Sequence, residues 1–552
     1  MAFSPPPSNA TTEGEGGSFW IALYLCFAGA CLTLLGFILV PSITQNFLGH
    51  TLEPGEIFQL NLVRIGACCI GLMMLAWGIY EIAFDRPGPL FLISFLSLFP
   101  VLIPFGFLGF GWDPDAWAVA GAALQIRETG EYVMSRPPGF PLFEGLAAAL
   151  VPWGGWSALL IANSLAGLIA CLAWLVMPNE IAIGKRRLIA LGLLVQPLFL
   201  LACCTGLDYI WQTLFVSLGV VCLLRATGGW VSRPAAWFVI SGVCIGLATG
   251  FRLTSLAILP LLAGTALLAT PVGRSRFGAF CSVLIPGLVV AFLCEIPVLA
   301  KGGLSALHVY PDDPHPIVLA HRLLRYVFSL PALILLGLAA LGVFLRWSSL
   351  IRAEKLLLAL SLGAIAIFLP AFFALPREAG YLTVILPFLS VLWGLLVPRP
   401  ALAVLLPAVA LWGFVSAPLI LPDPNQPVQY GFKPCPGPVV EEAAQRLAAM
   451  RRSQQLLSVT TTNKTAFIVA FDWAMLAYHR PDWIVENGIL KNPFSPVEFH
   501  DWIDTENYQR MKDEDYQFYI VGNSARFTRA KYNYDPFDEG ALAWTPGTRF
   551  YR

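Results

Sequence analysis

Long apolar segments, separated by short polar connections, occupy most of the chain up to about Leu421. Segments such as Phe19–Val40 and Gly380–Val397 approach or reach the roughly 20 residues that a helix needs to cross ~30 Å of hydrocarbon. Hydrophobic residues make up 57% of the 552 residues and charged residues 12%, about half the charged share of a soluble domain. The sequence therefore predicts an α-helical polytopic membrane protein.

The apolar segments predict about 13 transmembrane helices. They cover residues 19–41, 59–83, 89–110, 153–177, 188–204, 209–225, 235–250, 254–270, 277–299, 326–345, 356–374, 380–397 and 401–421. We expect residues 1–18 to be a disordered cytoplasmic tail and residues 19–88 to contain two additional N-terminal transmembrane helices. Residues 89–421 form the main transmembrane domain, with a long outer loop at 111–152.

Lysine and arginine are distributed unevenly between alternate connections. One set contains Arg86, Lys185, Arg186, Arg187, Arg225, Arg233, Arg274, Arg276, Arg346, Arg352, Lys355 and Arg399. The opposite set, longer in total, contains Arg127, Arg136, Arg252, Lys301, Arg322, Arg325 and Arg377. Because positive residues are retained in the cytoplasm, we predict a cytoplasmic N-terminus and an outer C-terminus in a bacterial inner membrane.

The composition changes after Leu421, where charged residues become frequent and no spanning segment remains. Leu456–Thr461, Trp483–Glu486 and Tyr516–Val521 have the composition of strands. Pro438–Gln454 and Ser495–Lys512 have that of helices. We predict that residues 422–552 form a small α/β domain outside the membrane, in the periplasm.

The outer loop at 111–152 contains the residues best suited to chemistry. Asp113 has the position of a helix N-cap, with Pro114 at the first helical position and Asp115 in the first turn. The helix should end at Gly130 and lie on the membrane surface. A capping role would explain one of the two acids. The alternative is that one of them accepts a proton from a hydroxyl group, as a general base does.

The loop resembles the corresponding loop of the GT-C superfamily of integral-membrane glycosyltransferases, of the aminoarabinose-transferase and protein O-mannosyltransferase type. The resemblance rests on Asp115-Ala116-Trp117, then a surface helix, Gly130-Glu131-Tyr132 and Pro137-Pro138-Gly139-Phe140-Pro141. It implies a GT-C-like fold for residues 89–421, the catalytic domain, and a catalytic acid at Asp115 or Asp113. The family pattern has a second acid where this chain has Ala116, so both aspartates remain candidates, with Asp115 preferred.

Two further segments resemble the family. Gly250–Thr254 contains Arg252 at the outer end of a span, and Arg377–Leu382 contains Arg377 and Tyr381. The resemblance implies that these three residues bind the phosphate of the donor, and arginine suits a phosphate because it offers paired donors. Snorkelling to lipid headgroups is the structural alternative for both arginines.

Four more polar residues on the outer side are candidates for the substrate site, namely Arg136, Asp208, His315 and His321. Histidine and aspartate can bind a divalent cation, but the spacings around Asp312-Asp313-Pro314-His315 match no standard ligand set. We therefore expect no bound metal and no cofactor, and interpret this loop as a cover for the donor site.

The predicted function is that of an inverting glycosyltransferase that moves a sugar from a polyprenyl-phosphate donor to a lipid, glycan or protein acceptor at the outer face of the membrane. Alternatives are a transporter or flippase, and a polysaccharide polymerase or ligase. Transport usually requires ionisable residues near the membrane midplane, and the spans contain few of them. The formal net charge of zero argues against nucleic acid as a partner.

Overall fold

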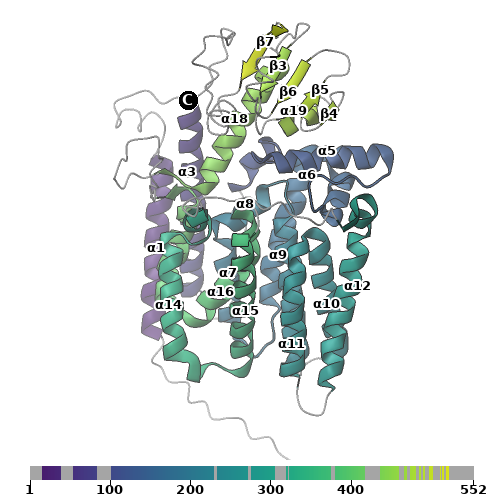
Figure 1. Cartoon of the computed structure of the whole chain (residues 1–552). Helices are drawn as coiled ribbons and strands as arrows, with labels where there is room; N and C mark the ends of the chain where they lie inside the picture. The colour runs from purple at the N-terminus through teal and green to yellow at the C-terminus, as the bar shows by residue number, and fades with distance from the viewer. Residues whose placement is uncertain are drawn as a thin grey trace, which may run out of the picture.

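The computed structural model describes residues 15–38, 54–83, 101–228, 233–270, 275–304, 319–320, 322–374, 379–416, 435–458, 465–468, 473–479, 484–486, 489–491, 497–500, 510, 513–514 and 517–520. Its helices form a bundle, and a small α/β unit lies at one end of it (Figure 1). This architecture confirms an α-helical polytopic membrane protein.

The helices of the bundle are mostly apolar, as the sequence predicts. They are α1 (Glu15–Ile38), α3 (Pro54–Ala83), α6 (Pro141–Leu175), α7 (Ile183–Leu194), α8 (Pro197–Cys204), α9 (Tyr209–Thr227), α10 (Pro234–Phe251), α11 (Leu259–Ala269), α12 (Arg276–Gly302), α14 (Leu330–Arg346), α15 (Arg352–Ala374), α16 (Leu386–Leu396) and α17 (Arg399–Trp412). Short turns of tighter or wider helix adjoin them, namely η3 (Ile103–Phe107), η4 (Leu253–Ile258), η6 (Leu323–Val327), η7 (Trp347–Ser349) and η8 (Ala379–Ile385).

Fewer of these helices are long enough to cross a membrane than the sequence suggests. In the described residues, 8 helices pass by length and composition, and α7 with α8 makes a ninth if the bent pair is one span. The two halves of that pair are inclined at 64°. Gln196 has extended backbone angles and Pro197 begins α8, and a proline cannot donate the hydrogen bond that would continue α7.

Four other predicted spans differ in the structure. Within 19–41, the apolar helix that the described residues contain, Ile21–Gly36, is shorter than a membrane span. Of residues 401–421, only 401–416 are described; they contain the end of the 14-residue helix α17, at Trp412, and the short strand β1 (Val415–Ser416). Residues 254–270 are divided between η4 and α11. Most of 89–110 lies outside the described residues, as do the boundaries at 88/89 and 421/422. The count of about 13 spans is therefore not confirmed.

One helix of the outer loop lies across the end of the bundle (Figure 1). This helix, α5 (Pro114–Thr129), ends at Gly130, whose φ of 70° is left-handed. Helix α6 then starts at Pro141 and enters the bundle. It bends at Gly155, whose φ is 54°, a backbone conformation that glycine adopts without a steric penalty. The bend lets one continuous segment change direction where it enters the bundle.

The C-terminal unit contains a mixed sheet and two helices. The strands β3 (Thr465–Ile468), β4 (Ile484–Glu486), β5 (Ile489–Lys491), β6 (Val497–His500) and β7 (Gln517–Ile520) form a five-stranded sheet in the order β4-β5-β6-β3-β7. Strand β3 is parallel to β6 and to β7, whereas β5 is antiparallel to β4 and to β6. A pair of short strands, β1 with β2 (Cys435–Pro436), precedes the sheet.

The helices of the unit, α18 (Pro438–Ser458) and α19 (Trp473–His479), contact the bundle. Helix α18 packs against α3 and α8, and α19 packs against α5 (Figure 1).

The predictions for β4 and β7 agree with the structure. Two others are wrong, because α18 includes Leu456–Ser458 and because β6 lies within the helix predicted at 495–512.

Candidate functional site

The N-terminus of α5 presents its two aspartates differently. The Asp113 carboxylate accepts a hydrogen bond from the backbone N–H of Asp115 at 2.9 Å, which makes Asp113 the N-cap. The buried indole of Trp117 donates to the Gly111 carbonyl at 2.8 Å and fixes the start of the helix. The side chain of Asp115 is 33% exposed. Asp113 is thus engaged with the helix backbone, whereas the partly exposed Asp115 carboxylate does not cap the helix.

A chain of ion pairs begins at Asp115 and continues into the protein. Nη1 of Arg136 lies 3.2 Å from Oδ2 of Asp115, and Nη2 of the same arginine lies 3.2 Å from Oδ1 of Asp208. The other Asp208 oxygen accepts a hydrogen bond from Arg252 at 2.7 Å. Side-chain exposure falls from 33% at Asp115 to 13% at Arg136 and to 0% at Asp208. The chain therefore connects a rim carboxylate to a buried one.

Aromatic rings surround the buried end of this chain. The Arg252 guanidinium carbon lies 4.0 Å from the ring centroid of Tyr381 and 4.3 Å from that of Tyr209. The ring of Phe140 lies against both Arg136, at 4.6 Å, and Arg252, at 5.3 Å. Cation–π contacts of this kind are strongest when the cation is desolvated, as Arg252 is. The rings therefore restrict both guanidinium groups.

Glu144 holds the loop that places Arg136. Its carboxylate is buried and accepts hydrogen bonds from the hydroxyl of Tyr132 at 2.5 Å and from the backbone N–H of Phe140 at 3.1 Å. It also accepts from the N–H of Ser135 at 2.7 Å and from its hydroxyl at 2.6 Å. Burial, followed by the nearby negative charge of Glu144, raises the pKa of Tyr132 well above its usual value, so this phenol stays a hydrogen-bond donor.

Glu144 is a residue of the site that no motif in the sequence marks. Phe140 is the N-cap residue of α6, and Glu144 is the fourth residue of the helix, one position beyond the acid of a capping box. The capping-box pattern therefore does not predict the contact with Phe140. The contacts with Tyr132 and Ser135 depend on how the loop folds back.

The short turn that contains Asp208 is fixed by hydrogen bonds to two other segments. The side-chain amide of Asn163 donates to the carbonyls of Thr205 at 2.5 Å and Leu207 at 3.3 Å, and its oxygen accepts from Trp211 at 2.8 Å. The N–H of Gly206 donates to the carbonyl of Phe110 at 2.6 Å. The turn is thereby tied to α6 and to the segment that leads into α5.

The structure brings together six of the residues predicted from the sequence, namely Asp113, Asp115, Arg136, Asp208, Arg252 and Tyr381. Arg377, His315 and His321 lie outside the described residues. Within the part of the chain that the structure describes, no group of three His, Cys, Asp or Glu side chains is arranged to hold a metal ion.

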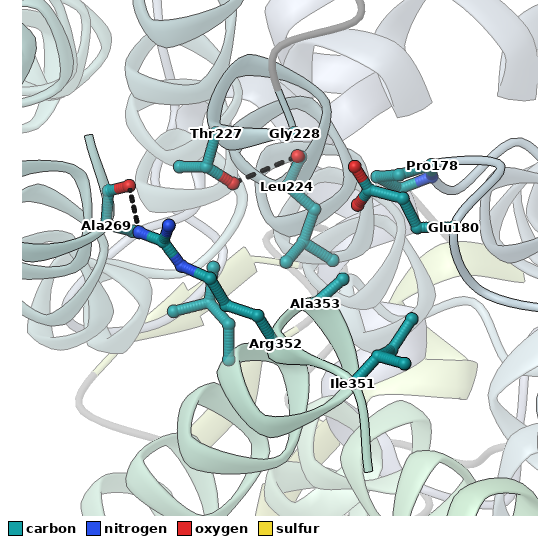
Figure 2. Close-up of a pocket in the computed structure, with 10 residues that line it drawn as sticks. Pro178, Glu180, Leu224, Thr227, Gly228, Ala269, Ile351, Arg352 and Ala353 are labelled. Atoms are coloured by element: carbon teal, nitrogen blue, oxygen red, sulfur yellow. Dashed lines mark hydrogen bonds between the residues drawn. The ribbon is translucent and has the colours of Figure 1, made fainter. Parts of the chain in front are cut away.

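Two cavities have none of the ion-pair residues in their lining. One, of 310 Å³, is an apolar groove between η3 and α6, with Phe107, Ser157 and Ile161 among its lining residues. The other, of 440 Å³, lies where α9 and α11 end and α15 begins. Figure 2 shows the guanidinium of Arg352 and the carboxylate of Glu180 at its edges. Helix α9 separates this second cavity from Asp208, because the helix begins at Tyr209 and ends at Thr227.

Comparisons with solved structures find two similar chains. The structure of ArnT from Cupriavidus metallidurans in the apo state is 13% identical, covers 70% of this chain and 84% of its own, and has a TM-score of 0.48. The structure of the same protein bound to undecaprenyl phosphate is 11% identical, covers 81% and 95%, and has a TM-score of 0.45. The likeness is one of fold. No family model and no curated protein sequence matches the chain.

The geometry of the cluster indicates its chemistry. A partly exposed carboxylate adjoins an arginine whose two terminal nitrogens are each directed at an acid. Such an arginine is held in one orientation and can stabilise an additional anion beside it. The carboxylate can accept a proton from a hydroxyl group that binds at the rim. The site therefore suits a reaction in which one proton is removed and negative charge develops nearby.

Proposed function

We propose that this chain is an inverting glycosyltransferase that moves a sugar from a polyprenyl-phosphate donor to a lipid, glycan or protein acceptor. The observation that supports the proposal most is the chain of ion pairs that ends at the partly exposed Asp115. Asp115 lies on a helix that crosses the end of a membrane bundle (Figure 1). The phosphate of a membrane lipid would lie at the same depth as this helix.

In the proposed reaction, an acceptor hydroxyl oxygen attacks the anomeric carbon while the bond between that carbon and the phosphate oxygen breaks. The hydroxyl proton passes to Asp115. Both electrons of the broken bond stay on the phosphate, which leaves as polyprenyl phosphate. Attack opposite to the leaving group inverts the configuration of the sugar. Arg136 stabilises the charge that develops on the phosphate.

The burial of Arg252 changes the role that we assign to it. The sequence suggested direct phosphate binding by Arg252, but this side chain is 2% exposed and donates to Asp208. We propose that Arg136 contacts the phosphate and that Arg252 supports it through Asp208. Tyr381 restrains Arg252 through its ring. Arg377 stays a predicted phosphate ligand.

Two aspartate variants test the proposal. Purified protein in lipid nanodiscs is given a panel of undecaprenyl-phosphate sugars and a glycolipid extract, and release of undecaprenyl phosphate is measured. Asp115→Asn should reduce release by about 10²–10⁴, the usual effect of losing a general base. Asp113→Asn is the matched control, because asparagine is a good N-cap. Full activity of Asp115→Asn, or activity lost only in Asp113→Asn, would contradict the assignment.

We also propose that the chain lies in a bacterial inner membrane, with the C-terminal unit in the periplasm. The support is the uneven distribution of lysine and arginine between the connections. Glu514 and Arg233 are exposed residues on the C-terminal unit and before α10. In intact spheroplasts, a membrane-impermeant thiol reagent should label Glu514→Cys and not Arg233→Cys. The reverse pattern would overturn the orientation.

A further inference from the structure

Helix α18 of the C-terminal unit places a fully buried arginine against the membrane bundle. Arg446 is 0% exposed. Its Nη1 donates a hydrogen bond to the carbonyl of Cys204 at 2.7 Å, and its Nε donates to Oε1 of Glu442 at 2.7 Å. Its guanidinium lies 4.9 Å from the ring centroid of Phe105. One side chain thus binds an acid on its own helix, a ring of η3 and the end of α8.

The carbonyl that Arg446 binds has a special position in the fold. Cys204 is the last residue of α8, and the backbone turns to an extended conformation at Thr205. Carbonyls at the end of a helix have no partner within the helix, and a positive charge there is favourable. Four residues later the chain reaches Asp208. Arg446 therefore fixes the starting point of the turn that contains Asp208.

A second contact from the same unit reaches the other half of the site. The ring of Tyr478 on α19 lies 5.3 Å from that of Phe110 and 5.5 Å from that of Trp117, in edge-to-face geometry. The carbonyl of Phe110 accepts the hydrogen bond from the N–H of Gly206, and Trp117 lies in the first turn of α5, two residues after Asp115. The C-terminal unit thus contacts both backbone segments that contain the acids.

We infer that Arg446 is a positioning residue for the ion-pair chain. It holds the turn at Cys204, which places Asp208, which in turn orients Arg136 beside Asp115. Lysine cannot replace it fully, because a single ammonium lacks the planar fork that reaches two acceptors in different directions. This inference rests on the proposed function only where activity is the measurement, since its structural part concerns the backbone at 204–208.

The experiment compares three variants of the full chain in nanodiscs. Arg446→Lys and Arg446→Met change the positioning residue, and Arg451→Met removes an exposed arginine of the same helix as the matched control. The first measurement is hydrogen exchange at the amide of Gly206, which needs no substrate. Exchange should be faster in Arg446→Met than in Arg451→Met, with Arg446→Lys between them. Equal exchange rates in all three would show that Arg446 does not hold the turn.

The second measurement separates positioning from general stability. Misplacement of a catalytic constellation by about 1 Å can cost about 10²-fold in rate, so Arg446→Met should lower kcat by about that factor with little change in acceptor KM. In an Asp208→Asn background, Arg446→Met should cause no further loss, because its effect acts through Asp208. A full additional loss in the double variant would overturn the inference. Faster exchange with unchanged kcat would overturn it too.

The two proposals fail in distinguishable ways. If the unmodified chain releases no undecaprenyl phosphate from any donor, the proposed function is wrong, and the exchange experiment still decides whether Arg446 holds the turn. If the unmodified chain is active and Arg446→Met is equally active, the proposed function stands and the inference is wrong.

Discussion

Both ends of the helical bundle contain arginines that make defined hydrogen bonds or ion pairs, but their partners differ. At the end near α5, Arg136 and Arg252 bind the carboxylates of Asp115 and Asp208. Each guanidinium is also fixed by an aromatic ring. The result is a set of charges in defined positions, one of them accessible from outside.

At the opposite end, the arginines bind the carbonyls of helix ends. Arg186 donates to the carbonyls of Leu175 at 3.0 Å and Met177 at 3.1 Å. Arg225 donates to Val176 at 2.6 Å, and Arg352 donates to Ala269 at 3.1 Å (Figure 2).

The arginines of the two ends therefore differ in what they bind, carboxylates near α5 and helix-end carbonyls at the opposite end, and this difference separates a role in the site from a role in the fold. A cation at a helix C-terminus satisfies carbonyls that the helix leaves open and interacts favourably with its dipole. Such an arginine stabilises the fold without requiring any substrate. An arginine between two carboxylates costs desolvation energy, and its retention at one end of the bundle is typical of a functional site.

The largest effect is expected from breaking the buried part of the ion-pair chain. Asp208→Asn leaves Arg252 buried without its carboxylate, and removing one partner of a buried pair typically costs about 3–5 kcal/mol. Thermal unfolding of the detergent-solubilised protein should show a clear fall in Tm. Glu180→Gln removes an exposed acid at the opposite end and should leave Tm within error. An equal loss in both variants would remove the distinction between the two ends.

A smaller effect is expected from the loop that places Arg136. Glu144→Gln replaces an acceptor of four hydrogen bonds by a side chain that has one acceptor oxygen and two donors. Each buried donor left unsatisfied costs about 1–3 kcal/mol, so unfolding should need less denaturant and the amide of Ser135 should exchange faster. Tyr132→Phe removes one of the four donors and should show a smaller change in the same direction. If Tyr132→Phe is the more damaging variant, Glu144 is not the centre of the loop.

Removal of an arginine at the opposite end should lower the thermal stability and leave the activity unchanged. Arg225→Gln loses a charged hydrogen bond to a helix-end carbonyl, and such interactions are typically worth 0.3–1 kcal/mol. We expect a small drop in Tm and unchanged release of undecaprenyl phosphate. A loss of activity comparable to that expected for Asp115→Asn would show that this end also takes part in the reaction.

The smallest effect is expected from an exposed ion pair near the site. Lys301 donates to Glu131 at 2.9 Å, and this bond lowers the pKa of the Glu131 carboxyl. A depressed carboxyl pKa means that the stabilisation is present above the unfolded pKa and is lost as pH falls through the folded one. Lys301→Ala should thus lower Tm slightly at neutral pH and not at all at acidic pH. A larger difference in acid would show that the sign is wrong.

Much of the membrane fold follows from the apolar segments, because helices in lipid must satisfy their own backbone and need a fixed length. The positions of α9, α10, α12 and α15 agree with the predicted spans. The break between α7 and α8 was missed, although Pro197 is a signal for it. Strand β6 is part of a segment predicted to be helical. It has only four residues, one of them charged, so its alternation of apolar and polar residues is weak. Its strand conformation depends on pairing with β3, which is distant in the sequence.

The candidate site shows the same division. Asp113 and Asp115 are recognisable because helix starts have local rules. Asn163 and Arg446 are not, because their partners are carbonyls at Thr205 and Cys204, and a carbonyl is present in every residue. No pattern in the sequence marks which one a side chain will reach.

The contact between Arg446 and Cys204 joins residues 242 positions apart, and this separation has a consequence for biosynthesis. The bundle helices up to α17 are made before α18 leaves the ribosome, so they must insert into the membrane while the turn at Asp208 lacks its last support. In that state the nascent chain contains its membrane helices, Asp115 and Asp208, but the turn that positions Asp208 is not yet held by Arg446. The order of synthesis alone would therefore delay the assembled site until α18 has been translated.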